Sequence, residues 1–107
     1  MDNITTIKEL KAKVEAFCEA RDWRQYHNPK DLAIGISTEA NELLSIFRFK
    51  DNNEMTEMFE KINKREEIQD EVADILFFVL RFAQMNNIDL SEALNNKIEK
   101  NNDSPSR

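Results

Sequence analysis

Apolar residues recur at helical spacing along the first part of the chain and predict a helix that ends near Arg21. Thr6, with Glu9 three residues later, forms the capping-box pattern that begins such a helix. The apolar stripe of this helix consists of Ile7, Leu10, Val14 and Phe17. Residues 22–28 then mix polar and aromatic side chains without clean periodicity, which predicts a loop.

A second helix is predicted from Pro29 to about Phe47. Asn28 suits the N-cap, and Pro29 suits the first helical position, where a backbone N–H is not needed. Gly35 lies inside this helix and weakens it by about 1 kcal/mol relative to Ala. Two interpretations are open: another helix approaches closely at Gly35, or the glycine is a tolerated defect.

A third helix is predicted from near Glu54 to about Asn86, with a kink or short break around residues 63–65. Its later half contains six consecutive apolar residues, Ile75–Leu80, which we expect to be mostly buried wherever the helix lies. Apolar residues on nearly every side are typical of a central helix in a bundle or at a subunit interface.

A fourth helix is predicted to follow, with Asp89 as N-cap and Glu92 at the third helical position. Its apolar stripe consists of Leu90, Leu94 and Ile98. This stripe is too narrow for an independent helix, so the helix must pack on the others. We expect residues 101–107 to form a frayed tail, with 102–107 outside the folded part.

The composition favours one all-α domain over residues 1–107, small enough that oligomerisation would help it bury apolar surface. One Gly and two Pro leave little turn chemistry for a sheet, so we expect a four-helix bundle subunit of a homo-oligomer. The single Cys18 cannot form an internal disulfide and the N-terminus lacks a leader pattern, so the cytoplasm is the expected compartment. No apolar run approaches the ~20 residues of a membrane span, and no membrane partner is expected.

The net charge of −6 is concentrated in the middle of the chain. Residues 39–74 carry eleven acids and five bases, whereas acids and bases balance in residues 1–38 and in residues 75–107. Such an acidic surface repels nucleic acid, so we expect no nucleic-acid partner. A small phosphate ester that arrives with a divalent cation remains compatible with it.

Two acid pairs lie in this acidic segment: Glu39 with Glu42 and, after 28 intervening residues, Glu71 with Asp74. A spacing of three places both carboxylates of a pair on one side of a helix. The pairs are either solvated, as acid pairs on helices commonly are, or they bind a cation. Burying an unpaired carboxylate is costly, and no Lys or Arg lies within one turn of Asp74. The hard oxygen ligands favour Mg²⁺, or Mn²⁺ in its place.

The aromatic residues of two predicted loops each allow a structural and a ligand-binding interpretation. Trp23, Tyr26 and His27 either anchor their loop to the core or present a stacking surface, and composition favours anchoring. One histidine makes no metal site by itself, so we interpret His27 first as a hydrogen-bonded structural residue. Phe49, which stands between two basic residues just past the first acid pair, is either a core residue or a ligand contact.

The paired motif of Glu39-x-x-Glu42 and Glu71-x-x-Asp74 resembles the metal-binding signature of the MazG-like all-α nucleoside triphosphate pyrophosphohydrolases, and especially their dCTP-pyrophosphatase type. The similarity covers nearly the whole chain and includes residues 21–27 and 89–101. It implies an enzyme that hydrolyses (deoxy)nucleoside triphosphates to monophosphate and pyrophosphate with Mg²⁺ and cleans the nucleotide pool. A pyrimidine such as dCTP is the first substrate to consider. We expect a homo-oligomer, with a tetramer favoured over a dimer.

The resemblance also implies roles for individual residues. The metal ligands would be Glu39, Glu42, Glu71 and Asp74, with one spare carboxylate acting as base. The positions that match base- and sugar-pocket residues are Trp23, Arg24, Gln25, Tyr26, His27, Phe49 and Phe78. Lys97 and Asn101 match residues that contact phosphate, reaching the site of a neighbouring subunit.

Three positions depart from the pattern of similar proteins. Phe49 is often Trp and Phe78 often Tyr in close relatives, so stacking is kept while a hydroxyl contact is lost. Val14 falls where some relatives have a polar ligand residue. After Asn101, the usual basic residues and Tyr-Pro are replaced by Asn-Asp-Ser-Pro at 102–105, which changes the segment that would close over substrate.

Two rival functions are compatible with the same scaffold. A non-catalytic helical module would use the acid cluster only to bind metal or a partner, but acids at all four motif positions argue against it. A phosphoribosyl-ATP pyrophosphatase would need a pocket for a larger substrate, and the loop at residues 23–27 favours the nucleoside triphosphate interpretation over it.

Overall fold

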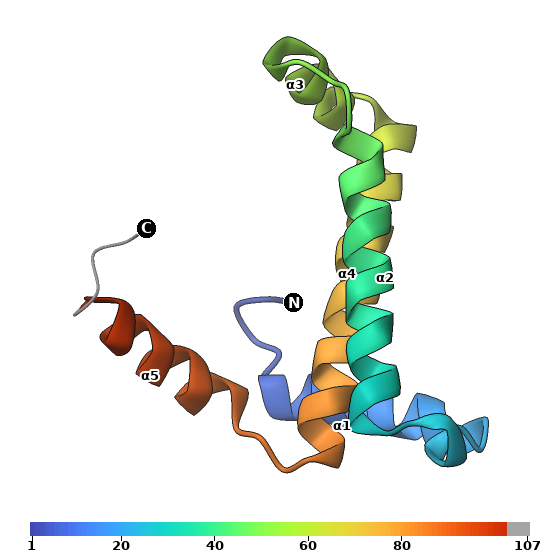
Figure 1. The fold of residues 1–107 in the computed structure, drawn as a ribbon, viewed down its shortest axis with the longest axis vertical. Coiled ribbons are helices and arrows are strands. Elements are labelled where there is room, and N and C mark those ends of the chain that lie inside the picture. The colour runs from blue at the N-terminus through green and yellow to red at the C-terminus, as the bar shows by residue number, and fades with distance from the viewer. Residues whose placement is uncertain (103–107) are drawn as a thin grey trace. The chain divides into compact units, whose positions relative to one another are not determined.

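The computed structural model describes residues 1–102, and its regular structure in this range is entirely helical (Figure 1). Its elements are α1 (Ile7–Ala20), a short 3₁₀ turn η1 (Arg24–Tyr26), α2 (Pro29–Phe47), α3 (Asn52–Glu60), α4 (Ile62–Met85) and α5 (Leu90–Asn102). The all-α prediction is confirmed. The predicted count of four helices is not, because the described residues form five α-helices.

Local capping accounts for the helix starts that were predicted. The backbone N–H of Glu9 donates to the Thr6 hydroxyl at 3.1 Å, and the Glu9 carboxylate accepts from the Thr6 backbone N–H at 3.2 Å. Asn28 accepts from the backbone N–H of Asp31 at 2.8 Å, with Pro29 at the first helical position. At α5, Asp89 accepts from the backbone N–H of Glu92 at 2.9 Å. These bonds satisfy N–H groups that the helix itself leaves unpaired.

The third predicted helix is divided at Lys61. Asp51 and Glu54 form a second capping box that begins α3 two residues before the predicted start. Lys61 then adopts an extended backbone, with φ −92° and ψ 124°, and this ends α3. The predicted break at residues 63–65 is therefore wrong by a few residues, because the extended Lys61 makes the break before α4 begins at Ile62.

The chain forms two compact units, which we describe separately. The central unit is Gln25–Val79, and the terminal unit joins Met1–Arg24 to the C-terminal segment that begins at Leu80. Helix α4 contributes to both units. Residues 101 and 102 are helical, which corrects part of the predicted tail, and the rest of that tail, 103–107, lies outside the described residues.

In the central unit, α2 and the first part of α4 lie side by side and run in opposite directions (Figure 1). Leu32, Met58 and Ile68 are its buried apolar residues. A Cβ atom built on Gly35 would lie 2.6 Å from the ring of Phe78, closer than atoms can approach. Gly35 therefore permits close packing of α2 against α4, which decides between the two interpretations of this glycine.

In the terminal unit, the buried residues of α1 are Val14 and Cys18, and those of α4 are Leu80, Arg81 and Ala83. Arg81 is completely buried and donates to Gln84 at 2.7 Å, and its guanidinium lies 3.6 Å from the Glu19 carboxylate. Gln84 in turn donates to Glu15 at 2.9 Å. This polar chain links α4 to α1 and gives the buried charge its partners.

Apolar residues remain exposed on several helices. Of the run Ile75–Leu80, which was predicted to be mostly buried, only Leu80 is buried, and Leu76 is 42% exposed. The prediction is wrong for the single chain because the described helices do not cover every side of α4. Helix α5 has no buried residue at all. Among residues 1–102, no helix has the length and apolar character needed to cross a bilayer.

Candidate metal-binding site

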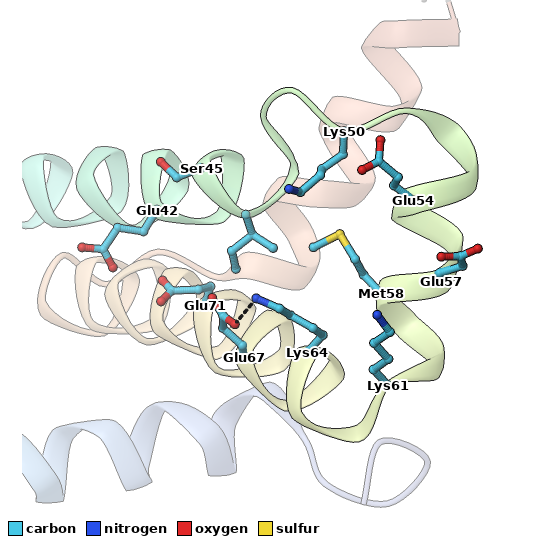
Figure 2. Close-up of a pocket in the computed structure, with 11 residues that line it drawn as sticks. Glu42, Ser45, Lys50, Glu54, Glu57, Met58, Lys61, Lys64, Glu67 and Glu71 are labelled. Carbon is cyan, nitrogen blue, oxygen red and sulfur yellow. Dashed lines mark hydrogen bonds and ion pairs between the residues drawn. The ribbon is translucent and has the colours of Figure 1, made fainter.

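The two predicted acid pairs meet in the central unit. Glu39 and Glu42 lie one turn apart on α2, and Glu71 lies on the facing part of α4. One carboxylate oxygen from each of the three residues lies within 4.8 Å of the other two. Figure 2 shows Glu42 and Glu71 directed toward the same space between the two helices. The spacing on each helix, together with the antiparallel packing at Gly35, brings these carboxylates together.

The cluster is electrostatically strained when no cation is bound. Burial, followed by a hydrogen bond with Glu42 and the charges of Glu42 and Asp74, raises the pKa of Glu39 to about 7. Burial and then the charge of Glu42 raise the pKa of Glu71 from its ordinary value. Carboxylates that share a site cannot all ionise without cost, so the cluster retains protons that free carboxylates would lose.

A divalent cation fits this donor set. The Oε2 atoms of Glu39 and Glu71 are buried and have no hydrogen-bond partner among residues 1–102. A hydrogen bond between two carboxyl groups is possible only when one keeps its proton, so ionised Glu39 and Glu71 need a positive partner instead. Carboxylate oxygens are the ligands preferred by Mg²⁺, Mn²⁺ and Ca²⁺. The acid cluster can therefore hold a metal.

Asp74 stands slightly apart from the other acids. It is exposed and is not one of the three residues whose oxygens converge within 4.8 Å. Its charge nevertheless contributes to the raised pKa of Glu39 and of Glu71, which places it beside the cluster. A role for Asp74 as a metal ligand stays a prediction.

The predicted substrate-contacting residues are divided between the two units. In the central unit, Phe49 is 95% exposed on the loop after α2, and Phe78 is half-buried against Gly35 with an edge-to-face contact to Phe77. Phe49 has a φ of 66°, a left-handed backbone that is costly for an aromatic residue. Its exposure excludes a core role within the chain. Gln25 and Tyr26 are exposed, and His27 is half-buried.

The remaining predicted contacts belong to the terminal unit. Trp23 packs edge-to-face on Phe17 at 5.5 Å, so it anchors its loop, as the composition had favoured. Arg24 lies 3.3 Å from the carboxylate of Glu19. Lys97 and Asn101 are exposed on α5. The substrate-binding roles of all these residues stay predictions.

The sequence-based expectations missed a group of lysines near the acid cluster. Lys50, Lys61 and Lys64 line a cavity that also includes Glu42 and Glu71. The spacing on α4 contained a clue, because Lys64 and Glu71 are seven residues apart and so lie on the same helix face. Lys50 and Lys61 lie outside helices, and no periodic pattern connects them to the site.

The fold and the site define an all-α protein in which two antiparallel helices carry a carboxylate cluster suited to a metal. The model of the MazG-like family matches residues 34–106 of the chain. The chain belongs to the MazG-like family.

The chain is similar to several characterised relatives. It is 27% identical over 96 residues to dCTP pyrophosphatase 1 of Mus musculus, which covers 90% of this chain and 56% of that protein. The identity to dCTP pyrophosphatase 1 of Bos taurus is 28%, over 90% of this chain and 57% of the relative. The chain thus spans little more than half the length of these relatives. It also superimposes on the crystal structure of a pyrophosphatase from Archaeoglobus fulgidus with a TM-score of 0.85, 34% identity, and coverage of 94% of this chain and 93% of the other.

Proposed function

We propose that this protein hydrolyses (deoxy)nucleoside triphosphates to monophosphate and pyrophosphate in a Mg²⁺-dependent reaction that cleans the nucleotide pool. The convergence of Glu39, Glu42 and Glu71, with two buried oxygens that lack partners, carries the proposal. The similarity to dCTP pyrophosphatases and to an archaeal pyrophosphatase supports it and makes dCTP the first substrate to test. A non-catalytic module would not need a strained carboxylate cluster beside a large cavity.

The chain supplies the carboxylates, and the cation supplies the positive charge. Bound Mg²⁺ would offset the charges of the cluster and of the triphosphate, and would lower the pKa of an attacking water. Glu39, Glu42 and Glu71 would hold the ion, with Asp74 completing the set or taking the proton from the water. Because the pKa values of Glu39 and Glu71 are raised in the metal-free protein, cation binding should release protons.

Two phenylalanines are the best-placed base contacts of the central unit. The exposed Phe49 ring on a left-handed backbone has no packing role in the chain that would account for it. Phe78 lies one turn along α4 from Asp74 and is held in place by the space that Gly35 leaves. Both rings can stack on a base, but neither residue has a hydroxyl group that could donate a hydrogen bond to it.

We also propose that the functional form is a homo-oligomer, with a tetramer favoured over a dimer. Val72 and Leu76 lie one turn apart on α4 and are 50% and 42% exposed. Ile34 and Leu44 on α2 and Leu94 and Ile98 on α5 are exposed as well. Exposed apolar surface on three helices of a 107-residue chain fits burial against further copies.

The proposed reaction can be tested with a panel of canonical and modified triphosphates, with Mg²⁺ present or chelated. We expect pyrophosphate as the product in the presence of Mg²⁺ and no turnover without the ion. Glu42→Gln should abolish the reaction, whereas Glu60→Gln, an exposed acid on α3 outside the cavity lining, should retain it. Orthophosphate as the only phosphate product of a phosphatase-free sample would contradict the proposal.

A further inference from the structure

A cavity of about 650 Å³ lies in the central unit beside the acid cluster (Figure 2). Glu42 and Glu71 form part of its wall, so the cavity and the proposed metal site are continuous. It extends from them toward the end of the unit where α2 leads into α3 and α3 into α4. Its volume lies in the range of small-molecule binding pockets.

Three lysines from three different segments line this cavity, together with five glutamates, Glu42, Glu54, Glu57, Glu67 and Glu71. Lys50 comes from the loop between α2 and α3, Lys61 from the break between α3 and α4, and Lys64 from the first turn of α4. Figure 2 shows the side chains of Lys50 and Lys64 extending from these segments toward the side of the cavity where Glu71 lies. The division of the third predicted helix at Lys61 is what places the segments around a common space.

Among residues 1–102, two of the three ammonium groups have no charged partner. Lys64 donates to Glu67 at 3.3 Å, and both side chains are about half exposed. Within the described part of the chain, the ammonium groups of Lys50 and Lys61 form no ion pair. The Glu54 carboxylate, which also lines the cavity, accepts from the backbone N–H of Asp51 at 3.1 Å as part of the α3 cap. Lys50 and Lys61 are therefore available to an anion.

Different side chains lie along α2 on the two sides of the acid cluster. Moving along α2 from Glu39 toward its N-terminus leads to Gly35 and the ring of Phe78. The cavity and its lysines lie beyond Glu42, toward the C-terminus of α2. Phe49 directly precedes Lys50, so aromatic rings that suit a base lie on both sides of the acid cluster. The free ammonium groups of the cavity lining, which suit phosphates, lie on the second side only.

We propose that the lysine-lined cavity binds the β- and γ-phosphates of the substrate and then the pyrophosphate leaving group, with Lys50 and Lys61 as the contacts. This inference rests on the proposed function. The oxygen of a water forms a bond to the α phosphorus, and the bond from that phosphorus to the α–β bridging oxygen breaks. The electron pair stays on the bridging oxygen, so pyrophosphate leaves with an added negative charge, and a carboxylate of the cluster or solvent takes the water's proton. Ammonium groups placed on the leaving-group side stabilise this charge.

The inference can be tested by titration calorimetry with inorganic pyrophosphate and, separately, with deoxycytidine monophosphate, both in the presence of Mg²⁺. The test variant is Lys50→Met with Lys61→Met, which removes both charges but keeps most of each aliphatic stem. Lys30→Met is the matched control, because Lys30 is an exposed lysine of the same unit that does not line the cavity. The double variant should raise the Kd for pyrophosphate about tenfold or more and leave the Kd for the monophosphate within about twofold. The paired Lys→Arg variant should recover most of the affinity.

The outcomes separate this inference from the proposed function. Pyrophosphate binding that matches the Lys30→Met control, in a protein that hydrolyses triphosphates, overturns the inference alone. An equal loss of monophosphate affinity also overturns it, because the cavity, with Ile46 and Met58 in its lining, would then hold the nucleoside. A wild type that binds pyrophosphate through the lysines but cleaves no triphosphate overturns the proposed function and leaves a polyphosphate-binding cavity.

Discussion

Glu39 on α2 and Glu71 on α4 each have one buried carboxylate oxygen with no hydrogen-bond partner in the described part of the chain, and one oxygen of Glu39 lies within 4.8 Å of one oxygen of Glu71. Such an arrangement opposes folding unless a proton or a cation joins it. A retained proton relieves the repulsion in the metal-free protein, and a bound cation is the partner that we propose for the functional form. Function and stability therefore conflict at this place in the fold.

The pH dependence of stability should reveal this conflict. Below pH 4.5, the ordinary pKa of a glutamate, Glu39 is protonated in both the folded and the unfolded chain. Its ionisation then does not reduce the free energy of unfolding. As the pH rises toward about 7, only the unfolded chain gives up the proton readily, so the free energy of unfolding decreases. We expect the Tm of the metal-free protein to fall between about pH 4.5 and 7 by at least about 4 °C, as measured by calorimetry.

Glu39→Gln supplies the comparison for this pH profile. The amide keeps the shape of the side chain and cannot ionise, so the decrease in Tm between pH 4.5 and 7 should become smaller. Glu60→Gln, an exposed acid outside the cluster, should leave the profile unchanged. If the Tm of the Glu39→Gln protein decreased with pH as steeply as that of the wild type, the cluster would not be strained.

Asp74→Asn separates a metal-site residue from a structural acid. Asp74 is exposed, and among the described residues its carboxylate accepts no hydrogen bond, so a structural role has little support. Hydrolysis should fall by several orders of magnitude, while the metal-free variant should melt at the wild-type temperature or above it. Mg²⁺ should raise the Tm of the wild type and do little for the variant.

Asp70→Asn is the matched control for that experiment, because Asp70 is an exposed acid one turn earlier on α4. It should retain both activity and the response of Tm to Mg²⁺. If Asp74→Asn instead destabilises the protein by about 1–3 kcal/mol and the Mg²⁺ response persists, then Asp74 is a structural acid.

Phe49 offers a prediction in which stability and substrate binding change in opposite directions. Phe49→Gly removes the cost of the left-handed backbone and should stabilise the chain by about 1 kcal/mol in chemical denaturation. Phe49→Ala removes the ring and should raise KM about tenfold or more without unfolding the protein, since a stacked base contributes about 1–3 kcal/mol. An unchanged KM in both variants would exclude stacking by Phe49.

The exposed residues of α4 predict that the folded monomer is not a stable species. Sedimentation equilibrium at micromolar concentration should give an oligomer. Val72→Glu together with Leu76→Lys should reduce the oligomer order, because both side chains lie on one exposed face of the helix. A folded wild-type monomer at that concentration would contradict the proposed assembly.

Features set by local chemistry could be predicted from the sequence. The bounds of α1 and α2 follow from caps at Thr6 and Asn28, where the partners lie three residues away. The approach of Glu39 and Glu42 to Glu71 could be predicted too, because helical spacing fixes one face on each helix and a cation gives a reason for the faces to meet.

Features set by contacts between distant segments could not be predicted. The burial of Arg81 depends on Gln84 and Glu19 being present on the helices that enclose it. The exposure of Leu76 depends on which helices cover α4. The lysine cavity requires the backbone of Lys61 to be extended, and nothing in the local pattern of residues 54–70 specified that position.

In the proposed reaction, the acid cluster promotes attack of water on the α phosphorus of a nucleoside triphosphate. Hydrolysis of dCTP with Mg²⁺ in ¹⁸O-labelled water tests it most directly, with mass spectrometry of both products. We expect the label in the monophosphate and unlabelled pyrophosphate. Label in pyrophosphate, or in released orthophosphate, would contradict it.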